Sequence, residues 1–182
     1  MRVNYLYLMT LVIVVCAFSG CKTSKNVSKG GHGYTTELHG GNDYESLSEK
    51  LKIQVSKSDD ILLFNRSAEW LGVPYKYGGN TRKGVDCSGL VVNIFEDVYG
   101  KRLYRNSAQI MENNCKKISK NELRTGDLVF FATGSSKKRI NHVGIYLKDG
   151  KFIHSSSSKG VIVSDMDEAY YVRTYVCSGR VI

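Results

Sequence analysis

The sequence predicts an α+β domain in which helices come first and an antiparallel β-sheet follows. Apolar residues recur at helical spacing in two early segments, 59–71 and 86–99. Beyond residue 126 the pattern changes to short apolar runs between turn residues, and these predicted strands are 127–132, 142–147, 151–155, 160–164 and 172–182. Helices followed by a run of strands, without regular alternation, are typical of an antiparallel sheet packed on helices.

Residues 1–20 have the features of a targeting signal. Arg2 supplies a positive charge, and the apolar run 6–18 is too short for a good transmembrane helix. Small residues then precede Cys21, as in a bacterial lipoprotein processing site, so cleavage would leave a lipidated Cys21 at the new amino terminus. The alternative is an ordinary signal peptide followed by a coincidental cysteine. Both interpretations predict export. The lipoprotein form predicts a periplasmic protein anchored in a membrane. Lys22 favours the outer membrane, because it gives no acidic retention signal for the inner membrane.

Residues 21–45 are rich in Lys, Ser, Thr, Gly and Asn and contain almost no apolar side chains. Such a segment cannot bury enough surface to offset the entropy of ordering it, so we expect a flexible tether and a folded domain at 46–182. The formal net charge is +9, and the charges of the tether cancel, so the excess lies on the folded domain. A basic exported domain suits an anionic partner such as cell-wall carboxylates, and no nucleic-acid motif is present.

The first predicted helix, at 59–71, is a packing element. Asp59 and Asp60 at its start suit the positive end of the helix dipole, while Gly72 and Pro74 end it. Its apolar face should contribute to the core.

The second predicted helix begins at or beside Cys87. Asp86 is a good N-cap residue, and the glycines at 78 and 79 permit a tight turn and a close backbone approach. At a helix N-terminus the macrodipole favours thiolate over thiol, and unpaired N–H groups point outward. The alternative is a cysteine that only fills a core position. The residues that accompany Cys87 decide between the two.

The domain contains two histidines, His142 and His154, on neighbouring predicted strands. A three-residue loop at 148–150 would place His154 opposite Gly144, with both imidazoles on one face and within hydrogen-bonding reach. A two-residue loop at 149–150 would instead place them on opposite faces. Nucleophilic catalysis needs a base beside the nucleophile and a group that orients the base. We therefore predict Cys87 as the nucleophile, His142 as the base and His154 as the orienting residue.

Several segments together resemble the successive motifs of the NlpC family, which are papain-like cysteine peptidases of the bacterial cell wall. These segments are Val73 to Gly79, Asp86 to Val91, Gly126 to Phe131, His142 to Tyr146 and Phe152 to His154. The resemblance implies a papain-like fold and the same Cys–His–His triad. It also implies that Tyr75 helps to form an oxyanion hole and that Asp86 and Ser88 line the substrate cleft.

The resemblance further implies an endopeptidase that acts on peptidoglycan stem peptides or their crosslinks. The lipoprotein form is similar to murein endopeptidases. The alternatives are a papain-like acyltransferase, which the order of cysteine before both histidines disfavours, and a non-catalytic wall-binding lipoprotein, which the intact triad disfavours. We expect a monomer that needs neither a metal nor an organic cofactor.

Two cysteines of the predicted domain remain outside the predicted site, Cys115 and Cys177. If the short strand at 116–118 pairs with the last strand at the sheet edge, a disulfide could join them. The alternative is two separate buried thiols.

Overall fold

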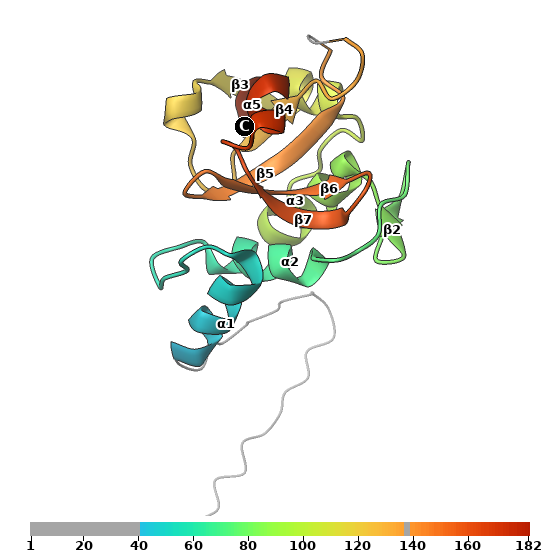
Figure 1. Ribbon diagram of the computed structural model, residues 1–182. Coiled ribbons are helices and arrows are strands. Elements are labelled where there is room, and N and C mark those ends of the chain that lie inside the picture. Colours follow the sequence, from blue (N-terminus) through green and yellow to red (C-terminus); the bar gives the residue numbers. More distant parts are fainter. Residues whose placement is uncertain (1–40, 137–138) are drawn as a thin grey trace, which may run out of the picture. The chain divides into compact units, whose positions relative to one another are not determined.

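The computed structural model describes residues 41–136 and 139–182 (Figure 1). The predicted signal segment, Cys21 and most of the predicted tether lie outside these residues. Three helices come first in the described chain, namely α1 (Gly41–Leu51), α2 (Ile61–Trp70) and α3 (Cys87–Tyr99). No helix in the described part is long and apolar enough to cross a membrane.

The main sheet has six strands in the order β3-β8-β4-β5-β6-β7, and all neighbouring pairs are antiparallel. Their bounds are β3 (Cys115–Ile118), β4 (Leu128–Phe131), β5 (His142–Lys148), β6 (Lys151–Ser156), β7 (Gly160–Asp165) and β8 (Tyr175–Val181). The shorter elements are β1 (Asn80–Thr81), β2 (Gly84–Val85), α4 (Ser107–Gln109), the π-turn η1 (Ile110–Asn114), the 3-10 turn η2 (Lys120–Glu122) and α5 (Ala169–Thr174). The predicted α+β class with an antiparallel sheet is confirmed.

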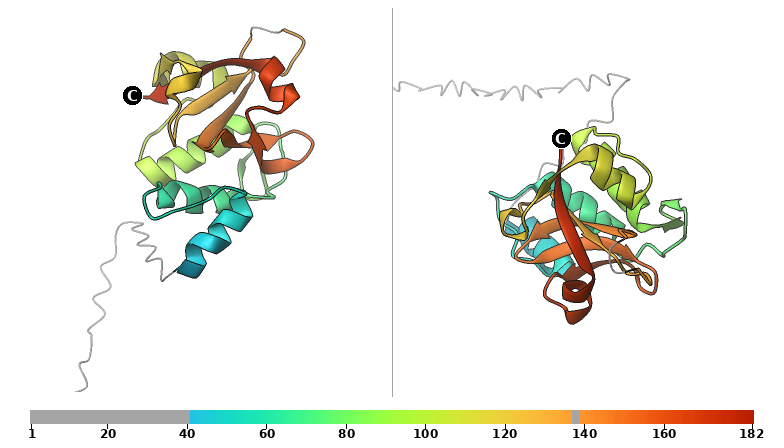
Figure 2. Two further views of the ribbon diagram at one scale, coloured as in Figure 1. Left: turned by 60° about the vertical axis from the view of Figure 1, so that its left-hand side comes forward. Right: turned by 90° about the horizontal axis from the view of Figure 1, so that it is seen from above.

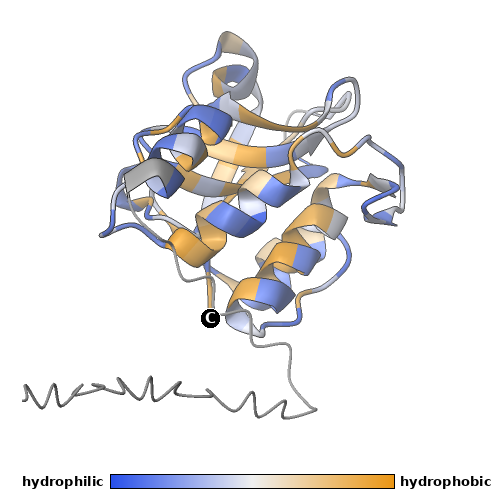
Figure 3. Ribbon diagram, turned by 90° about the horizontal axis from the view of Figure 1, so that it is seen from below, coloured by the Kyte–Doolittle hydropathy of each residue, from blue (hydrophilic) through white to orange (hydrophobic). Residues whose placement is uncertain are grey.

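The two long predicted helices form where the sequence places their caps. Asp60 caps α2 by accepting a hydrogen bond from the backbone N–H of Leu63, at 3.0 Å. Helix α3 ends at Gly100, whose left-handed φ of 63° is a conformation that glycine adopts without strain. Figure 3 shows hydrophobic and hydrophilic segments alternating along the helices, as expected when each helix buries one face.

Both faces of the central sheet are covered. Along β4, Leu128 and Phe130 join the larger core cluster, which includes residues of α2 and α3, while Val129 and Phe131 join a smaller cluster that includes Tyr171 of α5. The alternation follows from the period of two along a strand. Figure 1 shows α3 beside β5 and β6, and α5 near β4, and Figure 2 shows the same elements from two further directions. The sheet therefore separates two apolar layers.

The folded domain begins before residue 46, where the sequence analysis placed its boundary. Helix α1 starts at Gly41, Leu47 on it is buried, and Tyr44 packs against the main cluster. Leu51 of the same helix is also buried, so three of its side chains contact the core although most of its residues are polar. The last five residues of the predicted tether therefore belong to the domain.

The predicted last strand, 172–182, is wrong in its first three residues. Residues 172–174 close helix α5, and the strand starts at Tyr175. The tyrosines and valine there have strand propensity, but the helical turn buries Tyr171 against the aromatic rings of Phe131 and Phe152, at 5.3 and 4.9 Å between centroids. Tertiary packing overrides local propensity at this point.

The expected edge pairing forms, but Cys115 and Cys177 are both free thiols. In the register of β3 and β8, Cys115 lies opposite Val181. Cys177 is four residues further along, about 13 Å at strand spacing, which exceeds the separation that a disulfide spans. The disulfide is therefore corrected to two separate thiols.

The loop between β5 and β6 differs from the predicted three-residue loop. It is a two-residue turn of Asp149 and Gly150, with φ values of 50° and 75°. A register shift just before the turn compensates for the missing residue, so Ile145 still lies opposite Ile153. The predicted register is correct although the loop is shorter.

The position of Gly144 on β5 generates a stability prediction. A Cβ atom there would lie 2.6 Å from Cδ2 of Phe152 and 2.8 Å from the backbone oxygen of Ile153. We expect Gly144→Ala to lower the free energy of unfolding by about 3 kcal/mol, because the paired strand must move. Urea unfolding measures the change. Gly72→Ala is the control, since Gly72 has a left-handed φ of 77° but open space around it. Equal losses in the two variants would contradict the steric explanation.

Candidate active site

Cys87 is the first residue of α3, as predicted. Asp86 adopts an extended conformation and caps the helix, its Oδ1 accepting the backbone N–H of Gly89 at 2.7 Å. The sulfur lies 4.0 Å from the backbone oxygen of Asn141, the residue before His142. The helix start therefore brings the thiol to the beginning of β5.

The chain before α3 forms a tight turn that brings Tyr75 beside the thiol. Tyr75 pairs with Val85 in an isolated β-bridge. A Cβ atom at Gly79 would lie 2.4 Å from the backbone oxygen of Gly84, so only glycine fits the turn. Burial raises the pKa of Tyr75, and the negative charges that Cys87 and Asp86 carry at alkaline pH add to the shift. Its hydroxyl group therefore stays protonated and available as a donor.

The two histidines meet on one face of the sheet, as the predicted register requires. His142 Nε2 and His154 Nδ1 are 2.9 Å apart, and the two rings are nearly perpendicular at 85°. Gly144 lies beside His154 and leaves room for it. Because Nε2 of His142 is engaged by His154, Nδ1 is the nitrogen left to act as a base.

Two residues that the sequence analysis missed complete the surroundings of His154. Its Nε2 lies 3.0 Å from the hydroxyl of Tyr171 and 3.1 Å from Oγ of Ser164. His154 is 1% exposed, so both ring nitrogens are bonded inside the protein. The sequence carries no local signal for this, since α5 and β7 meet His154 only in the folded chain.

A cleft of about 370 Å³ joins these groups in one space. Its lining includes the four predicted residues Tyr75, Cys87, His142 and His154, together with Tyr77, Thr133, Asn141, Ser155, Ser156, Ser157, Tyr170 and Tyr171. A second hollow of about 390 Å³ shares Tyr77 and Asn141 with it and includes Arg139. A substrate chain can therefore extend past the thiol.

The protonation state of the pair differs from the predicted thiolate. Burial raises the pKa of Cys87, and the backbone N–H groups of Val143 and Ser88 offset this only in part. Burial also lowers the pKa of His142, to about 4. Both shifts favour a neutral thiol and a neutral imidazole in the unliganded site, because burial opposes the charged form of each group. The proton must then move as the substrate reacts.

Asp86 and Ser88 do not line the cleft, contrary to expectation. Both are buried, at 8% and 6% exposure, and Asp86 accepts hydrogen bonds from Gly78 and Gly89. Arg105 also binds both side chains. Their polar atoms form hydrogen bonds within the protein, so these two side chains stabilise the start of α3 and do not face the cleft.

Among the described residues, no group of His, Cys, Asp and Glu side chains is arranged to hold a metal ion. The site is built from a thiol, two imidazoles and hydroxyl groups.

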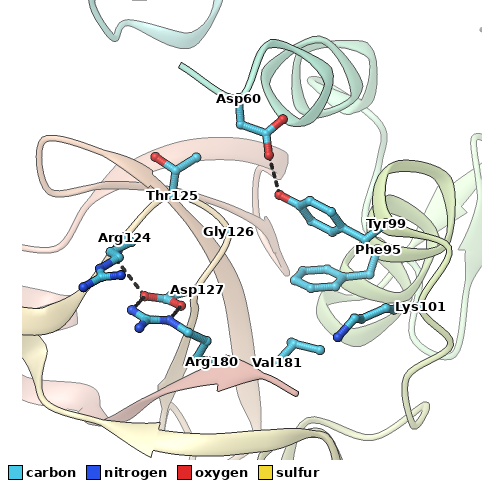
Figure 4. A pocket seen from close by; sticks show the side chains of 10 residues that line it. All are labelled: Asp60, Phe95, Tyr99, Lys101, Arg124, Thr125, Gly126, Asp127, Arg180 and Val181. Carbon is cyan, nitrogen blue, oxygen red and sulfur yellow. Dashed lines mark hydrogen bonds and ion pairs between the residues drawn. The ribbon is translucent and has the colours of Figure 1, made fainter. Parts of the chain in front are cut away.

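A separate cavity of about 320 Å³ lies at the other end of α3 (Figure 4). Four of its polar side chains form structural contacts: Arg180 forms two hydrogen bonds of 2.8 Å with Asp127, and the Tyr99 hydroxyl donates to Asp60 at 2.7 Å. Its lining contains no paired nucleophile and base. The reactive groups are therefore concentrated at the N-terminal end of α3.

The chain resembles known proteins over nearly its whole length. It is 35% identical to a protein of Escherichia coli (strain K12) named murein DD-endopeptidase MepS/murein LD-carboxypeptidase, over 96% of this chain and 89% of that one. It is 46% identical to the probable endopeptidase NlpC of the same organism, over 74% of this chain and 82% of that one.

The fold also resembles solved structures. The crystal structure of an NlpC/P60 family protein from Bacillus cereus ATCC 10987 superposes with a TM-score of 0.62 at 30% identity, and covers 70% of this chain and 41% of that one. The family model described as NlpC/P60 matches residues 72–180, which include the cysteine turn and both histidines. Sequence, fold and site agree that the chain belongs to the NlpC/P60 family.

Proposed function

We propose that this protein is a cysteine peptidase that cleaves the peptides of peptidoglycan. The observation that carries the proposal is the 2.9 Å contact between His142 and His154 in the cleft that also holds Cys87. A thiol, a base and an orienting group in one cleft are the parts that covalent catalysis requires. One Escherichia coli relative is named a murein DD-endopeptidase and the other a probable endopeptidase, and the first name supports the same substrate class.

In the first step, Nδ1 of His142 takes the proton of the Cys87 thiol as the sulfur attacks the scissile carbonyl carbon. His154 holds the His142 ring in place through Nε2. The carbonyl oxygen becomes an oxyanion, which the Tyr75 hydroxyl and the backbone N–H groups at the start of α3 stabilise. Neutral reactants suit this step, since charge develops only in the transition state.

In the second step, the imidazolium of His142 gives its proton to the leaving amine as the C–N bond breaks. The acyl group stays on Cys87 as a thioester. His142, neutral again, takes a proton from water, whose oxygen attacks the thioester and releases the acid and the thiol. The cycle leaves the protein unchanged.

The substrate is a stem peptide of the wall or a crosslink between two stems. The cleft that holds Cys87 and the second hollow share Tyr77 and Asn141, so together they offer space for an extended peptide. Purified protein incubated with uncrosslinked and crosslinked muropeptides, followed by mass spectrometry, distinguishes the two: new monomers from dimers identify the crosslink. Intact peptides of both kinds after incubation with folded protein would overturn the proposed function.

We also propose that the protein acts as a monomer anchored through a lipid on Cys21, facing the wall from the outer membrane. The apolar run that ends in small residues before Cys21 supports this. The basic charge of the domain suits an anionic wall polymer.

Substitution of the three triad residues should lower the rate of cleavage to different extents. We expect Cys87→Ser to abolish cleavage, His142→Ala to lower kcat at least about a thousandfold, and His154→Ala to lower it less, because His154 acts through His142. Cleavage of muropeptides measures the effect. Cys115→Ala is the control, a thiol outside the cleft. Substantial turnover by folded Cys87→Ser protein would rule out the thiol mechanism.

The pH dependence follows from the burial of His142. Its pKa of about 4 lies below the ordinary value of 6.5, so the base stays unprotonated well into the acid range. We expect kcat/KM to hold from neutral pH to about pH 5 and to fall as the pH drops through about 4. The unfolded chain takes up a proton below pH 6.5 and the folded one does not, so stability also declines between 6.5 and 4. An acid limb centred at 6.5 would contradict the lowered pKa of His142.

Lipid attachment is tested by metabolic labelling with a fatty acid. The wild type should incorporate the label and partition with membranes, and Cys21→Ala should do neither. Cys16→Ala is the matched control, because Cys16 lies inside the apolar run. An unlabelled wild-type protein would favour the ordinary signal peptide.

A further inference from the structure

Arg105 lies in the segment after α3 and reaches back to the start of that helix. Its Nη1 donates to Oδ1 of Asp86 and to Oγ of Ser88, each at 2.6 Å. Its Nη2 donates to the backbone oxygen of Gly79, also at 2.6 Å. One planar guanidinium thus joins the glycine turn before Cys87 to the residues on either side of it.

The carboxylate of Asp86 is the second part of this arrangement. Oδ1 accepts from Gly89 and Oδ2 from the backbone N–H of Gly78, at 2.7 and 2.9 Å. These bonds, with Arg105, hold the pKa of Asp86 below its usual range despite burial. A permanent negative charge therefore stands one residue from the sulfur, and it opposes formation of a thiolate.

The other titratable groups around the sulfur carry no charge that offsets Asp86. Tyr75 stays protonated because burial raises its pKa, and burial lowers the pKa of both His142 and His154, so the imidazoles are neutral. Among the described residues, Arg105 is the cation that forms an ion pair with Asp86.

We infer that Arg105 is a positioning residue of the thiol site, which fixes the glycine turn against the start of α3 and cancels the charge of Asp86 so that negative charge can develop on Cys87. It lies outside the cleft lining and acts through Asp86 and the backbone. The expected effect of Arg105 on turnover rests on the proposed peptidase function. Its expected effect on the reactivity of the Cys87 thiol does not.

The test is the rate of alkylation of Cys87 by iodoacetamide as a function of pH, read by mass spectrometry of the Cys87 peptide. Removal of the cation by Arg105→Met should raise the pKa of the thiol and slow alkylation at pH 7 about tenfold. Arg102→Met is the matched control, since Arg102 lies on the same segment and pairs with Glu96 at the surface. It should match the wild type. Identical profiles for folded Arg105→Met and the wild type would overturn the electrostatic role.

Arg105→Lys separates charge from geometry and serves if Arg105→Met does not fold. Lysine keeps the positive charge but loses the fork that joins Gly79 to Asp86 and Ser88. We expect alkylation near the wild-type rate, kcat lowered about tenfold and KM little changed. Wild-type kcat in Arg105→Lys would overturn the positioning role. If no protein, including the wild type, cleaved the peptides while the variants still differed in alkylation rate, the proposed function would be overturned. The inference about the thiol would stand.

Discussion

The pairing register of β5 and β6 is the constraint on which the site depends. Side chains alternate between the faces of a strand, so a shift of one residue would turn His154 away from His142. The observed register, with Ile145 opposite Ile153, keeps both imidazoles on one face at 2.9 Å. Gly144 makes this possible, since any larger residue would collide with the neighbouring strand. The base is thus oriented by backbone pairing in the sheet before any substrate arrives.

The sequence predicts most of the fold because its strongest signals are local. The caps of α2 and α3 and the strand runs of β4 to β7 depend on neighbouring residues. The failures arise where distant contacts decide. Residues 172–174 turn helical to bury Tyr171, and the start of α1 depends on the packing of Tyr44 and Leu47. The prediction for the hairpin loop was one residue too long, yet the predicted strand register was correct. A register irregularity beside the turn compensates for the shorter loop, and the sequence gives no sign of it.

In the site, too, features set by local sequence were predictable and features set by distant contacts were not. A nucleophile at a helix start and two histidines in one register were predictable from spacing, and Tyr75 from the family resemblance. Protonation was not, because the dipole is readable from sequence whereas burial is a property of the folded chain. The positions of Asp86 and Ser88 were also missed, since Arg105 approaches them from a segment 17 residues after Ser88. Contacts that close around a motif from elsewhere in the chain leave no trace in the motif itself.

The placement of β8 has a consequence for how the protein is made. Residues 175–181 lie between β3 and β4, so they hold the edge strand to the rest of the sheet. Until that segment has been synthesised, β3 has no partner in the sheet and β4 has an open edge. A nascent chain therefore cannot complete its sheet until residues 175–181 have been made. The topology links the moment of folding to the arrival of the last strand.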